Sequence, residues 1–357
     1  MKKTKRLVFI RTDEIGDFLI WSACFNSLKR FYSSYEIHLV CNSLCVDIAN
    51  QFDIFDVIIP IHKKRFHSST LYKLKMLFHL KKIKYDTLIC PIYSRNFSET
   101  DYLTNHIRAQ HKIGVNGDLA NISEKDRLIT DSYYTKLLTL NSDFKMELQR
   151  NFDFVEKLTQ VPVSETLPNL IWNFSEIKKV SRQKFQVVLG LGASNLKRSW
   201  AVDSFLKLVS FFNSDVTLCL VGVSDEQHLA DYFIANYKGD IEIINLVGKT
   251  SIVDLFSIIK MSYCVISNET MFTHLAVCLK IPSVVITGGG HFDRFIPYKL
   301  SRPFTNEETL YLPVPIYRKL ECYNCNWNCI YPTDLIWPCI GQIPVSDVVQ
   351  KLLNLPQ

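Results

Sequence analysis

The sequence lacks several patterns that each mark a class of protein. It contains no run of about 18 uncharged apolar residues, so we expect no membrane-spanning helix. Only Leu7–Ile10 separate the basic N-terminal residues from Arg11, which is too short for the apolar core of a secretory signal. These absences predict a cytoplasmic protein.

Two motifs of nucleotide sites are also missing. The turn expected at residues 11–17 has no Gly-x-Gly-x-x-Gly run, which argues against a nicotinamide cofactor. Asp-x-Asp occurs nowhere in the chain, although paired carboxylates commonly hold the divalent cation that neutralises a diphosphate. A bound diphosphate would therefore be neutralised by helix N-termini and a lysine, and we expect no catalytic cofactor.

Acidic residues are absent from Val57 to Tyr85, a stretch with eight Lys or Arg and three His residues. Its apolar residues recur at helical spacing, which predicts a basic amphipathic helix. These residues are Leu71, Leu74, Leu77, Phe78 and Leu80. The charges form either a solvated helix face or a surface for an anionic partner, such as acidic lipid headgroups or an acidic glycolipid.

The chain of 357 residues is long enough for two domains. Apolar strands alternate with helical segments, which predicts βαβ units and parallel sheets. Strands are expected at 6–10, 36–40, 55–60, 87–92, 186–191, 216–222, 243–246, 263–267 and 283–287. Helices are expected at 17–31, 202–212, 226–237, 252–260, 272–279 and 345–353.

Residues 161–185 interrupt this alternation with Pro162, Pro168 and a polar run, so they are the expected linker. We therefore expect two doubly wound, Rossmann-like α/β domains at 1–165 and 185–345, facing each other across a cleft, and a terminal helix within 346–357.

The first expected strand leads into the turn at residues 11–17. Gly16 permits a tight turn, and Asp17 stands at or near the start of the following helix. The helix dipole and free N–H groups keep such a carboxylate ionised, so Asp17 could accept a proton. Alternatively, Asp17 only caps the helix.

Two loops in the second half carry groups suited to a nucleotide. In the loop Gly190–Trp200, Ser194 can donate a hydrogen bond and Lys197 can place a charge on phosphate, unless this basic pair is only solvated. After the strand that ends near Gly222, Glu226 could accept hydrogen bonds from ribose, or could merely cap a helix.

Residues 266–276 read Ile-Ser-Asn-Glu-Thr-Met-Phe-Thr-His-Leu-Ala and predict a strand, a turn and a helix. Free backbone N–H groups at such a helix start favour anions. This places Thr270, Met271 and Phe272 at a candidate phosphate site. His274 lies beside it, although a lone histidine is more often a structural group.

These motifs together resemble the glycosyltransferase 9 family, the ADP-heptose:lipopolysaccharide heptosyltransferases. The matching segments are Arg11-Thr12-Asp13-Glu14-Ile15-Gly16-Asp17; Gly192-Ala193-Ser194 with Lys197-Arg198-Ser199-Trp200; Val221-Gly222 with Glu226; Leu246-Val247-Gly248-Lys249-Thr250; and Asn268-Glu269-Thr270 with His274-Leu275-Ala276. They occur in the family's order over nearly the whole chain.

The resemblance implies a GT-B fold with the acceptor in the N-terminal domain and the nucleotide sugar in the C-terminal one. It also implies an inverting, metal-independent enzyme. The enzyme would transfer heptose from ADP-heptose to a lipopolysaccharide core or a related surface glycan.

Site residues follow from the same resemblance. Asp17 would be the base for the acceptor hydroxyl, and Glu226 would contact the nucleoside. The diphosphate would be held by Ser194, Lys197, the backbone at Thr270, Met271 and Phe272, and His274. Lys63, Lys64 and Arg65 are the candidate acceptor-binding residues.

The chain departs from the family pattern at two places near the donor. Glu269-Thr270-Met271 stands where the family usually has Asp-Thr-Gly, and Gly190-Leu191 replaces His-Pro. Both changes bear on the identity of the sugar rather than on the fold.

Four of the 11 cysteines cluster near the C-terminus: Cys322, Cys325, Cys329 and Cys339. In a cytosolic protein such a cluster indicates metal binding more than disulfides, and four thiolates suit a structural, tetrahedral zinc site. The alternative is reduced thiols packed around Trp327 and Trp337.

The expected partners are a nucleotide-sugar donor and an anionic glycolipid or oligosaccharide acceptor. We also expect peripheral binding at the inner face of the cytoplasmic membrane and no nucleic-acid partner. Two other functions suit the same scaffold: a nucleotide-sugar epimerase and a non-catalytic nucleotide-sugar-binding protein.

Overall fold

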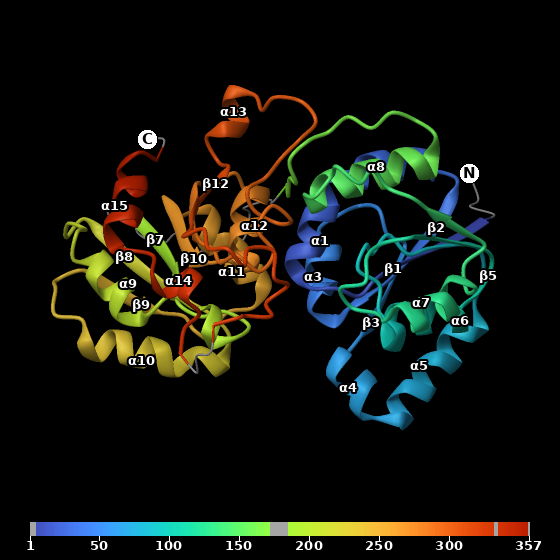
Figure 1. Cartoon of the computed structure of the whole chain (residues 1–357), viewed down its shortest axis with the longest axis horizontal. Helices are drawn as coiled ribbons and strands as arrows, with labels where there is room; N and C mark the ends of the chain where they lie inside the picture. The colour runs from blue at the N-terminus through green and yellow to red at the C-terminus, as the bar shows by residue number, and fades with distance from the viewer. Residues whose placement is uncertain (1–4, 172–184, 332–334, 356–357) are drawn as a thin grey trace. The chain divides into compact units, whose positions relative to one another are not determined.

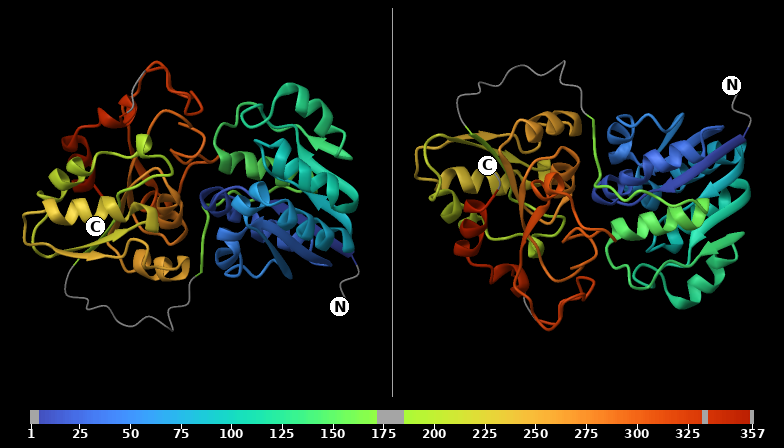
Figure 2. Two further views of the ribbon diagram at one scale, coloured as in Figure 1. Left: turned by 90° about the horizontal axis from the view of Figure 1, so that it is seen from below. Right: turned by 90° about the horizontal axis from the view of Figure 1, so that it is seen from above.

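The computed structural model describes residues 5–171, 185–331 and 335–355. The chain divides into two compact units, Met1–Thr166 and Leu167–Gln357. Each unit contains a six-stranded sheet whose paired strands are all parallel. Helices cover both faces of each sheet (Figures 1 and 2). The expected α/β class is therefore confirmed.

The first sheet has the strand order β3-β2-β1-β4-β5-β6. Its strands are β1 (Lys5–Arg11), β2 (Tyr35–Asn42), β3 (Val57–Ile61), β4 (Lys84–Ile89), β5 (Arg108–Val115) and β6 (Lys136–Leu138). The α-helices are α1 (Ile15–Trp21), α2 (Phe25–Phe31), α3 (Val46–Ala49), α4 (Lys63–Ser68), α5 (Thr70–Lys82), α6 (Tyr102–His106), α7 (Glu124–Asp131) and α8 (Glu147–Thr159).

Successive residues of β1 face opposite sides of this sheet, and both sides are buried. Phe9 packs edge-on against Trp21 of α1, with ring centroids 5.4 Å apart. Val8 belongs to the core cluster on the other side, with Phe66 of α4 and Leu80 of α5. The sheet is thus fixed between two helical layers.

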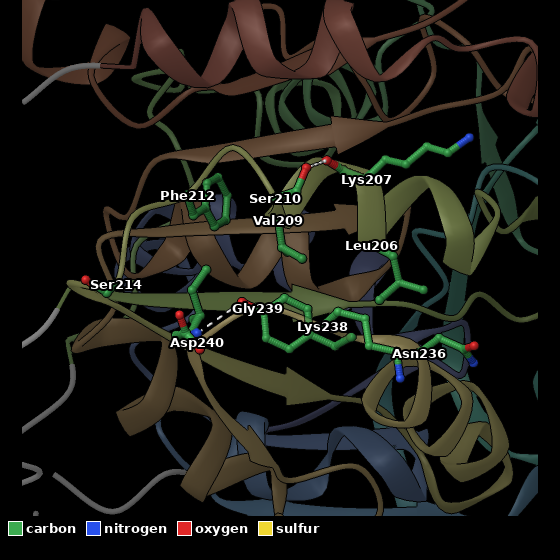
Figure 3. Close-up of a pocket in the computed structure, with 12 residues that line it drawn as sticks. Leu206, Lys207, Val209, Ser210, Phe212, Ser214, Asn236, Lys238, Gly239 and Asp240 are labelled. Carbon is green, nitrogen blue, oxygen red and sulfur yellow. Dashed lines mark hydrogen bonds between the residues drawn. The ribbon is translucent and has the colours of Figure 1, made fainter.

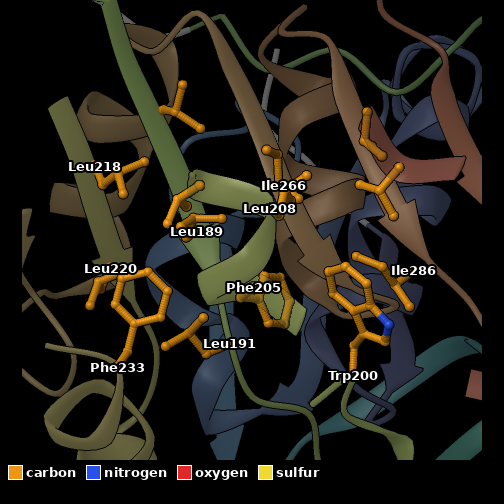
Figure 4. Close-up of a cluster of buried hydrophobic side chains, with 14 of the residues drawn as sticks. Leu189, Leu191, Trp200, Phe205, Leu208, Leu218, Leu220, Phe233, Ile266 and Ile286 are labelled. Carbon is orange, nitrogen blue, oxygen red and sulfur yellow. The ribbon is translucent and has the colours of Figure 1, made fainter. Parts of the chain in front are cut away.

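The second sheet has the order β12-β11-β10-β7-β8-β9. Its strands are β7 (Phe185–Gly190), β8 (Val216–Val221), β9 (Glu242–Asn245), β10 (Cys264–Asn268), β11 (Ser283–Ile286) and β12 (Pro313–Ile316). The α-helices are α9 (Val202–Val209), α10 (Gln227–Asn236), α11 (Ile252–Lys260), α12 (Met271–Cys278), α13 (Asn306–Thr309), α14 (Pro338–Gly341) and α15 (Val345–Leu353). Figure 4 shows leucine and isoleucine side chains of the strands packed with Phe205, Phe233 and Trp200.

Two expected helices of the first unit are interrupted. A 3₁₀ turn at Ser22–Cys24 divides the helix expected over 17–31, and the Ser22 hydroxyl donates to the Leu19 carbonyl at 2.6 Å. The basic helix is divided at Ser69, whose extended backbone ends α4 and whose hydroxyl caps α5 by accepting from Tyr72 N. In both places a serine hydroxyl bonds the local backbone and competes with helix continuity.

The prediction of a single apolar stripe on the basic helix is also wrong. Only Leu77 and Leu80 of α5 are buried, whereas Leu71, Leu74 and Phe78 are exposed. The five apolar residues, although helically spaced, therefore belong to two different faces of α5.

Several elements of the structure carry no clear signal in the sequence. The strands β5, β6 and β12 and the helices α6, α7 and α8 were not expected. β12 contains Pro313 and Pro315 and lies at a sheet edge, where a residue without an N–H is tolerated. β6 is a three-residue edge strand. Part of the expected linker, residues 172–184, lies outside the described residues.

One buried amide joins the loops at the centre of the second sheet. Asn268, at the end of β10, is fully buried. Its Nδ2 donates to the carbonyl oxygens of Leu191 and Gly192 at 2.9 and 3.1 Å, and its Oδ1 accepts from Trp200 N at 2.8 Å. The loop after β7 is therefore attached at both ends to β10.

Asn268→Asp should lower the free energy of unfolding by about 3 kcal/mol, because the carboxylate cannot donate to two buried carbonyl oxygens. Urea denaturation followed by circular dichroism measures this change. The control is Asn236→Asp, which removes one exposed hydrogen bond to the Tyr232 carbonyl and should cost less than about 0.5 kcal/mol. Equal midpoints for the two variants would contradict the role of Asn268.

Candidate active site

Each sheet reverses its strand order at its centre, between β1 and β4 and between β7 and β10. In doubly wound sheets, ligands bind beyond the carboxyl ends of the strands at these points. The turn with Asp17 follows β1, the loop with Ser194 and Lys197 follows β7, and Thr270 follows β10. The sequence motifs therefore lie at the two reversal points.

A buried guanidinium organises the turn after β1. Arg11 has no exposed surface, and its Nε lies 3.0 Å from Asp13 Oδ1. Its Nη2 donates to the Asp17 carbonyl oxygen at 3.2 Å and lies 3.9 Å from Oε1 of the buried Glu147. Arg11 thus fixes the backbone that presents Asp17.

The carboxyl groups near Arg11 outnumber its single positive charge. Burial raises the pKa of Asp13 well above its ordinary value, Arg11 opposes this shift, and the charges of Asp17 and Glu147 add to it. Asp17 itself lies in the first turn of α1 and is only partly buried. The N-cap position belongs to Glu14, so Asp17 stands three residues into the helix.

Of the candidate acceptor residues, Lys63 reaches the same turn. Its Nζ donates to Glu14 Oε1 at 2.7 Å. Lys64 and Arg65 are exposed on α4, and the Arg65 guanidinium lies over the Tyr72 ring at 5.0 Å. The structure therefore joins Lys63 to the Asp17 turn and leaves its two neighbours at the surface.

The loop after β7 presents two cations. Lys197 N donates to Asn195 Oδ1 at 2.9 Å, and Arg198 Nη1 donates to Ser194 Oγ at 3.1 Å. Burial lowers the pKa of Arg198, and Glu269 partly offsets this effect. Arg198 was not selected as a donor-site residue from the sequence, although it stands beside Lys197 in a segment that matches the family.

The start of α12 offers unpaired donors beside this loop. Thr270 is the N-cap residue but makes no side-chain capping bond. The hydroxyls of Thr270 and the buried Thr273 have no hydrogen-bond partner among the described residues. First-turn N–H groups at Met271 and Phe272 add to these donors, as expected for an anion site.

His274 lies in the interior of this helix. Its Nδ1 is 2.9 Å from the Tyr298 hydroxyl, and burial lowers the pKa of His274 to about 4. The ring is therefore neutral at pH 7 and brings no positive charge to a phosphate.

The unusual Glu269 turns toward β11. The Thr287 hydroxyl donates to its carboxylate, and burial raises the pKa of Glu269. The longer side chain is thus accommodated by Thr287, with Arg198 as its nearest compensating charge.

Glu226 fills the space above two glycines. A Cβ atom at Gly192 would lie 2.1 Å from Glu226 Oε1, and one at Gly222 would lie 2.3 Å from Oε2. Val223 N donates to Oε2 at 3.0 Å. The carboxylate of Glu226 therefore lies against the loop that carries Ser194.

The cysteine-rich segment packs against the same cationic loop. Trp337 N donates to the Lys197 carbonyl at 2.9 Å, and the Arg198 guanidinium lies 3.9 Å over the Trp327 ring. Trp327 and Trp337 stack with centroids 5.4 Å apart. The segment thus supports Lys197 and Arg198 from one side.

All four clustered cysteines line one small cavity, together with Trp327 and Trp337. Burial raises the pKa of the Cys339 thiol, and the other three thiols raise it further. Nevertheless, within residues 5–171, 185–331 and 335–355 no group of three or more His, Cys, Asp or Glu side chains has the spacing of a metal site. The four thiols share one cavity without having the spacing of a metal site.

A larger cavity of about 550 Å³ lies elsewhere in the second unit. Its lining includes Lys207, Ser214, Asn236, Lys238 and Asp240 (Figure 3). Ser214 and Asp240 precede β8 and β9, so this cavity lies at the amino ends of strands, and no predicted site residue lines it. It is not the expected place for the nucleotide.

No helix in the part of the chain that the structure describes has the length and apolar character needed to cross a membrane.

Comparison with solved structures identifies the same two-domain fold. The ADP-heptose lps heptosyltransferase II of E. coli is 14% identical with a TM-score of 0.72, and the alignment covers 98% of each chain. The glycosyl transferase family 9 protein from Veillonella parvula DSM 2008 is 14% identical with a TM-score of 0.76, covering 99% of this chain and 97% of the other. These likenesses establish the GT-B fold.

A third structure, the dodecameric iron-containing heptosyltransferase TibC, is 13% identical with a TM-score of 0.56, covering 99% of this chain and 77% of the other. No curated protein matches the sequence.

The sequence itself identifies the family. Residues 78–307 match the family model for glycosyltransferase family 9 (heptosyltransferase), which is more than half of the chain and includes both loops of the second reversal point. The expected resemblance is confirmed, and the protein is a glycosyltransferase that belongs to family 9.

Proposed function

We propose that the protein is an inverting, metal-independent transferase that moves heptose from ADP-heptose onto a lipopolysaccharide core or a related surface glycan. Membership of the heptosyltransferase family supports the reaction class. The name of the E. coli neighbour, an ADP-heptose lps heptosyltransferase, suggests the donor and the acceptor.

The observation that carries the proposal is the cluster of anion-binding groups in the second unit. The hydroxyls of Thr270 and Thr273 have no partner among the described residues, and they lie at the start of α12. Asn268 attaches this strand end to the loop that presents Lys197 and Arg198. Helix N–H groups, hydroxyls and two cations supply the charge stabilisation that a leaving diphosphate requires.

In this proposal Asp17 accepts the proton of the acceptor hydroxyl. The resulting oxygen nucleophile forms a bond to the anomeric carbon while the bond from that carbon to the diphosphate breaks. The electron pair leaves with ADP, whose negative charge is held by Lys197, Arg198 and the start of α12. One displacement from the opposite face inverts the anomeric configuration.

The other donor residues take supporting roles. Ser194 and the backbone at Thr270, Met271 and Phe272 bond diphosphate oxygens. His274 acts as a neutral group that orients the helix through Tyr298. Glu226 accepts hydrogen bonds from the nucleoside, and its contact with Gly192 aligns it with the phosphate loop.

The proposed acceptor is an anionic glycolipid or oligosaccharide, bound through Lys63, Lys64 and Arg65. Lys63 is the best placed of these, since it contacts Glu14 in the Asp17 turn. A glycolipid acceptor would bring the enzyme to the cytoplasmic face of a membrane as a peripheral protein.

Family membership favours a transferase over the epimerase and the non-catalytic binding protein that the sequence left open. A donor screen separates the three. The purified protein is incubated with ADP-, GDP- or UDP-sugars and an acceptor oligosaccharide, and products are identified by mass. The expected product is the acceptor plus one heptose from ADP-heptose.

Asp17→Asn should lower kcat in this assay by about 10²- to 10⁴-fold without changing donor affinity, because the amide cannot accept the proton. The matched comparison is Asp13→Asn, which removes a partly buried carboxyl paired with Arg11 but not the proposed base. A normal kcat for Asp17→Asn would remove Asp17 from the mechanism. If the product is instead an epimerised sugar nucleotide, the protein is an epimerase and not a transferase.

Lys197→Ala and Arg198→Ala should each weaken ADP binding by about ten-fold, because each removes a charge from the diphosphate site. Isothermal titration calorimetry measures the dissociation constants. Lys238→Ala is the control, since Lys238 lies by the cavity at the amino ends of the strands. An unchanged affinity for both loop variants would contradict the proposed phosphate site.

We propose in addition that Cys322, Cys325, Cys329 and Cys339 hold a structural metal ion, zinc or iron. Their convergence on one cavity supports this donor set, and four thiolates suit either ion. TibC, a neighbour of the same fold, is iron-containing. Through Trp327 and Trp337 the ion would stabilise the loop that carries Arg198.

Elemental analysis of purified protein should give about one zinc or iron per chain. Cys322→Ser with Cys325→Ser should remove the metal and lower the melting temperature, whereas Cys264→Ser, in the core of β10, should leave the metal content unchanged. Protein without stoichiometric metal would establish the cysteines as reduced thiols.

A further inference from the structure

The outer face of α5 carries an apolar stripe. Leu71, Leu74 and Phe78 are 65%, 59% and 66% exposed. Their spacing of three and four residues places them on one side of the helix, while the buried Leu77 and Leu80 pack an adjacent side into the core. Three large apolar side chains together form a patch rather than the scattered exposure that is normal for a soluble surface.

Positive charge surrounds this stripe. Lys75, Lys81 and Lys82 are exposed on the same helix, and the Lys82 ammonium lies 4.3 Å over the Phe78 ring. The sequence has no acidic residue between Val57 and Tyr85 that could neutralise them. A partner for this face must therefore be apolar along the stripe and negatively charged at its sides.

The other side of α5 is packed against its unit. On its inner side, the Lys73 ammonium lies 3.7 Å over the Tyr102 ring of α6, and the Arg65 guanidinium of α4 lies over Tyr72. Figure 1 shows α5 at the periphery of its unit, beside α4 and α6. The apolar stripe thus lies on a regular helix that is packed against the core.

We propose that α5 binds the surface of an anionic lipid bilayer. Leu71, Leu74 and Phe78 enter the boundary between headgroups and acyl chains, and Lys75, Lys81 and Lys82 pair with lipid phosphates. A second copy of this chain is a poorer occupant, because pairing two such faces would bring like charges together.

This surface adjoins the proposed acceptor residues. α4 and α5 are separated only by Ser69, and Lys63 at the start of α4 contacts Glu14 of the Asp17 turn. A bilayer bound by α5 would therefore lie near the site that takes the acceptor. The link to the acceptor rests on the proposed function, whereas lipid binding by α5 does not.

Co-sedimentation of the full chain with lipid vesicles tests the proposal. The protein should bind vesicles of phosphatidylglycerol and phosphatidylcholine, bind pure phosphatidylcholine weakly, and dissociate at high salt. Leu71→Ser/Leu74→Ser/Phe78→Ser and Lys75→Gln/Lys81→Gln/Lys82→Gln should each lower the partition coefficient by about ten-fold or more. Leu128→Ser, at a leucine of α7 that is 74% exposed, should bind as the wild type does.

Wild-type partitioning by both triple variants would overturn the proposal. A second outcome would also overturn it: the wild-type protein is a dimer that does not bind vesicles, and the apolar variant is a monomer. In that case a second copy of the chain would occupy the face of α5. Circular dichroism confirms that the variants are folded.

Transfer to a lipid-free acceptor oligosaccharide separates the two proposals. The apolar variant should keep wild-type turnover on this acceptor and lose activity only on acceptor embedded in vesicles. Vesicle binding without any sugar transfer would refute the proposed function and leave the role of α5 intact.

Discussion

The amide of Asn268 joins the end of β10 to the loop after β7, the two segments that carry the proposed donor site. It is fully buried at the end of β10 and bonds Leu191, Gly192 and Trp200 across the reversal point of the second sheet. A buried amide can satisfy two carbonyl oxygens and one N–H only in one orientation. The Asn268 side chain therefore fixes the first residues of this loop and Trp200, on either side of Lys197 and Arg198.

Further contacts make this attachment stiff. The Trp200 indole donates to the Ile343 carbonyl, and Trp337 N donates to the Lys197 carbonyl. A Cβ atom at Gly190 would lie 2.8 Å from the Phe272 ring, so strand β7 and helix α12 approach as closely as a glycine allows. The charged loop and the start of α12 therefore share one framework, which suits preorganised binding of a diphosphate.

The sequence predicted elements best where local signals agreed with tertiary structure. Helices α11 and α15 have the expected bounds; Ser251 and Asp254 form a capping box at the start of α11, and Pro344 precedes α15. The expected positions of Asp17, Ser194, Lys197 and Thr270 at strand ends also agree with the structure, because strand periodicity locates the ends of parallel strands.

Contacts between distant segments could not be predicted in this way. Trp200 is 68 residues from Asn268, and no local pattern reveals their bond. The burial that makes His274 neutral and the exposure of Leu71, Leu74 and Phe78 depend on which face of each helix meets the sheet, and a mixed apolar pattern does not specify that face. The strand β12 was missed because its prolines are acceptable only at an edge.

The close fit of Glu226 over Gly192 and Gly222 ties three positions to one another. In a combinatorial library of this domain, a side chain at either glycine requires that Glu226 move aside or be replaced by a shorter residue. Varying all three codons together would therefore reach combinations of side chains that changes at one glycine alone do not accommodate.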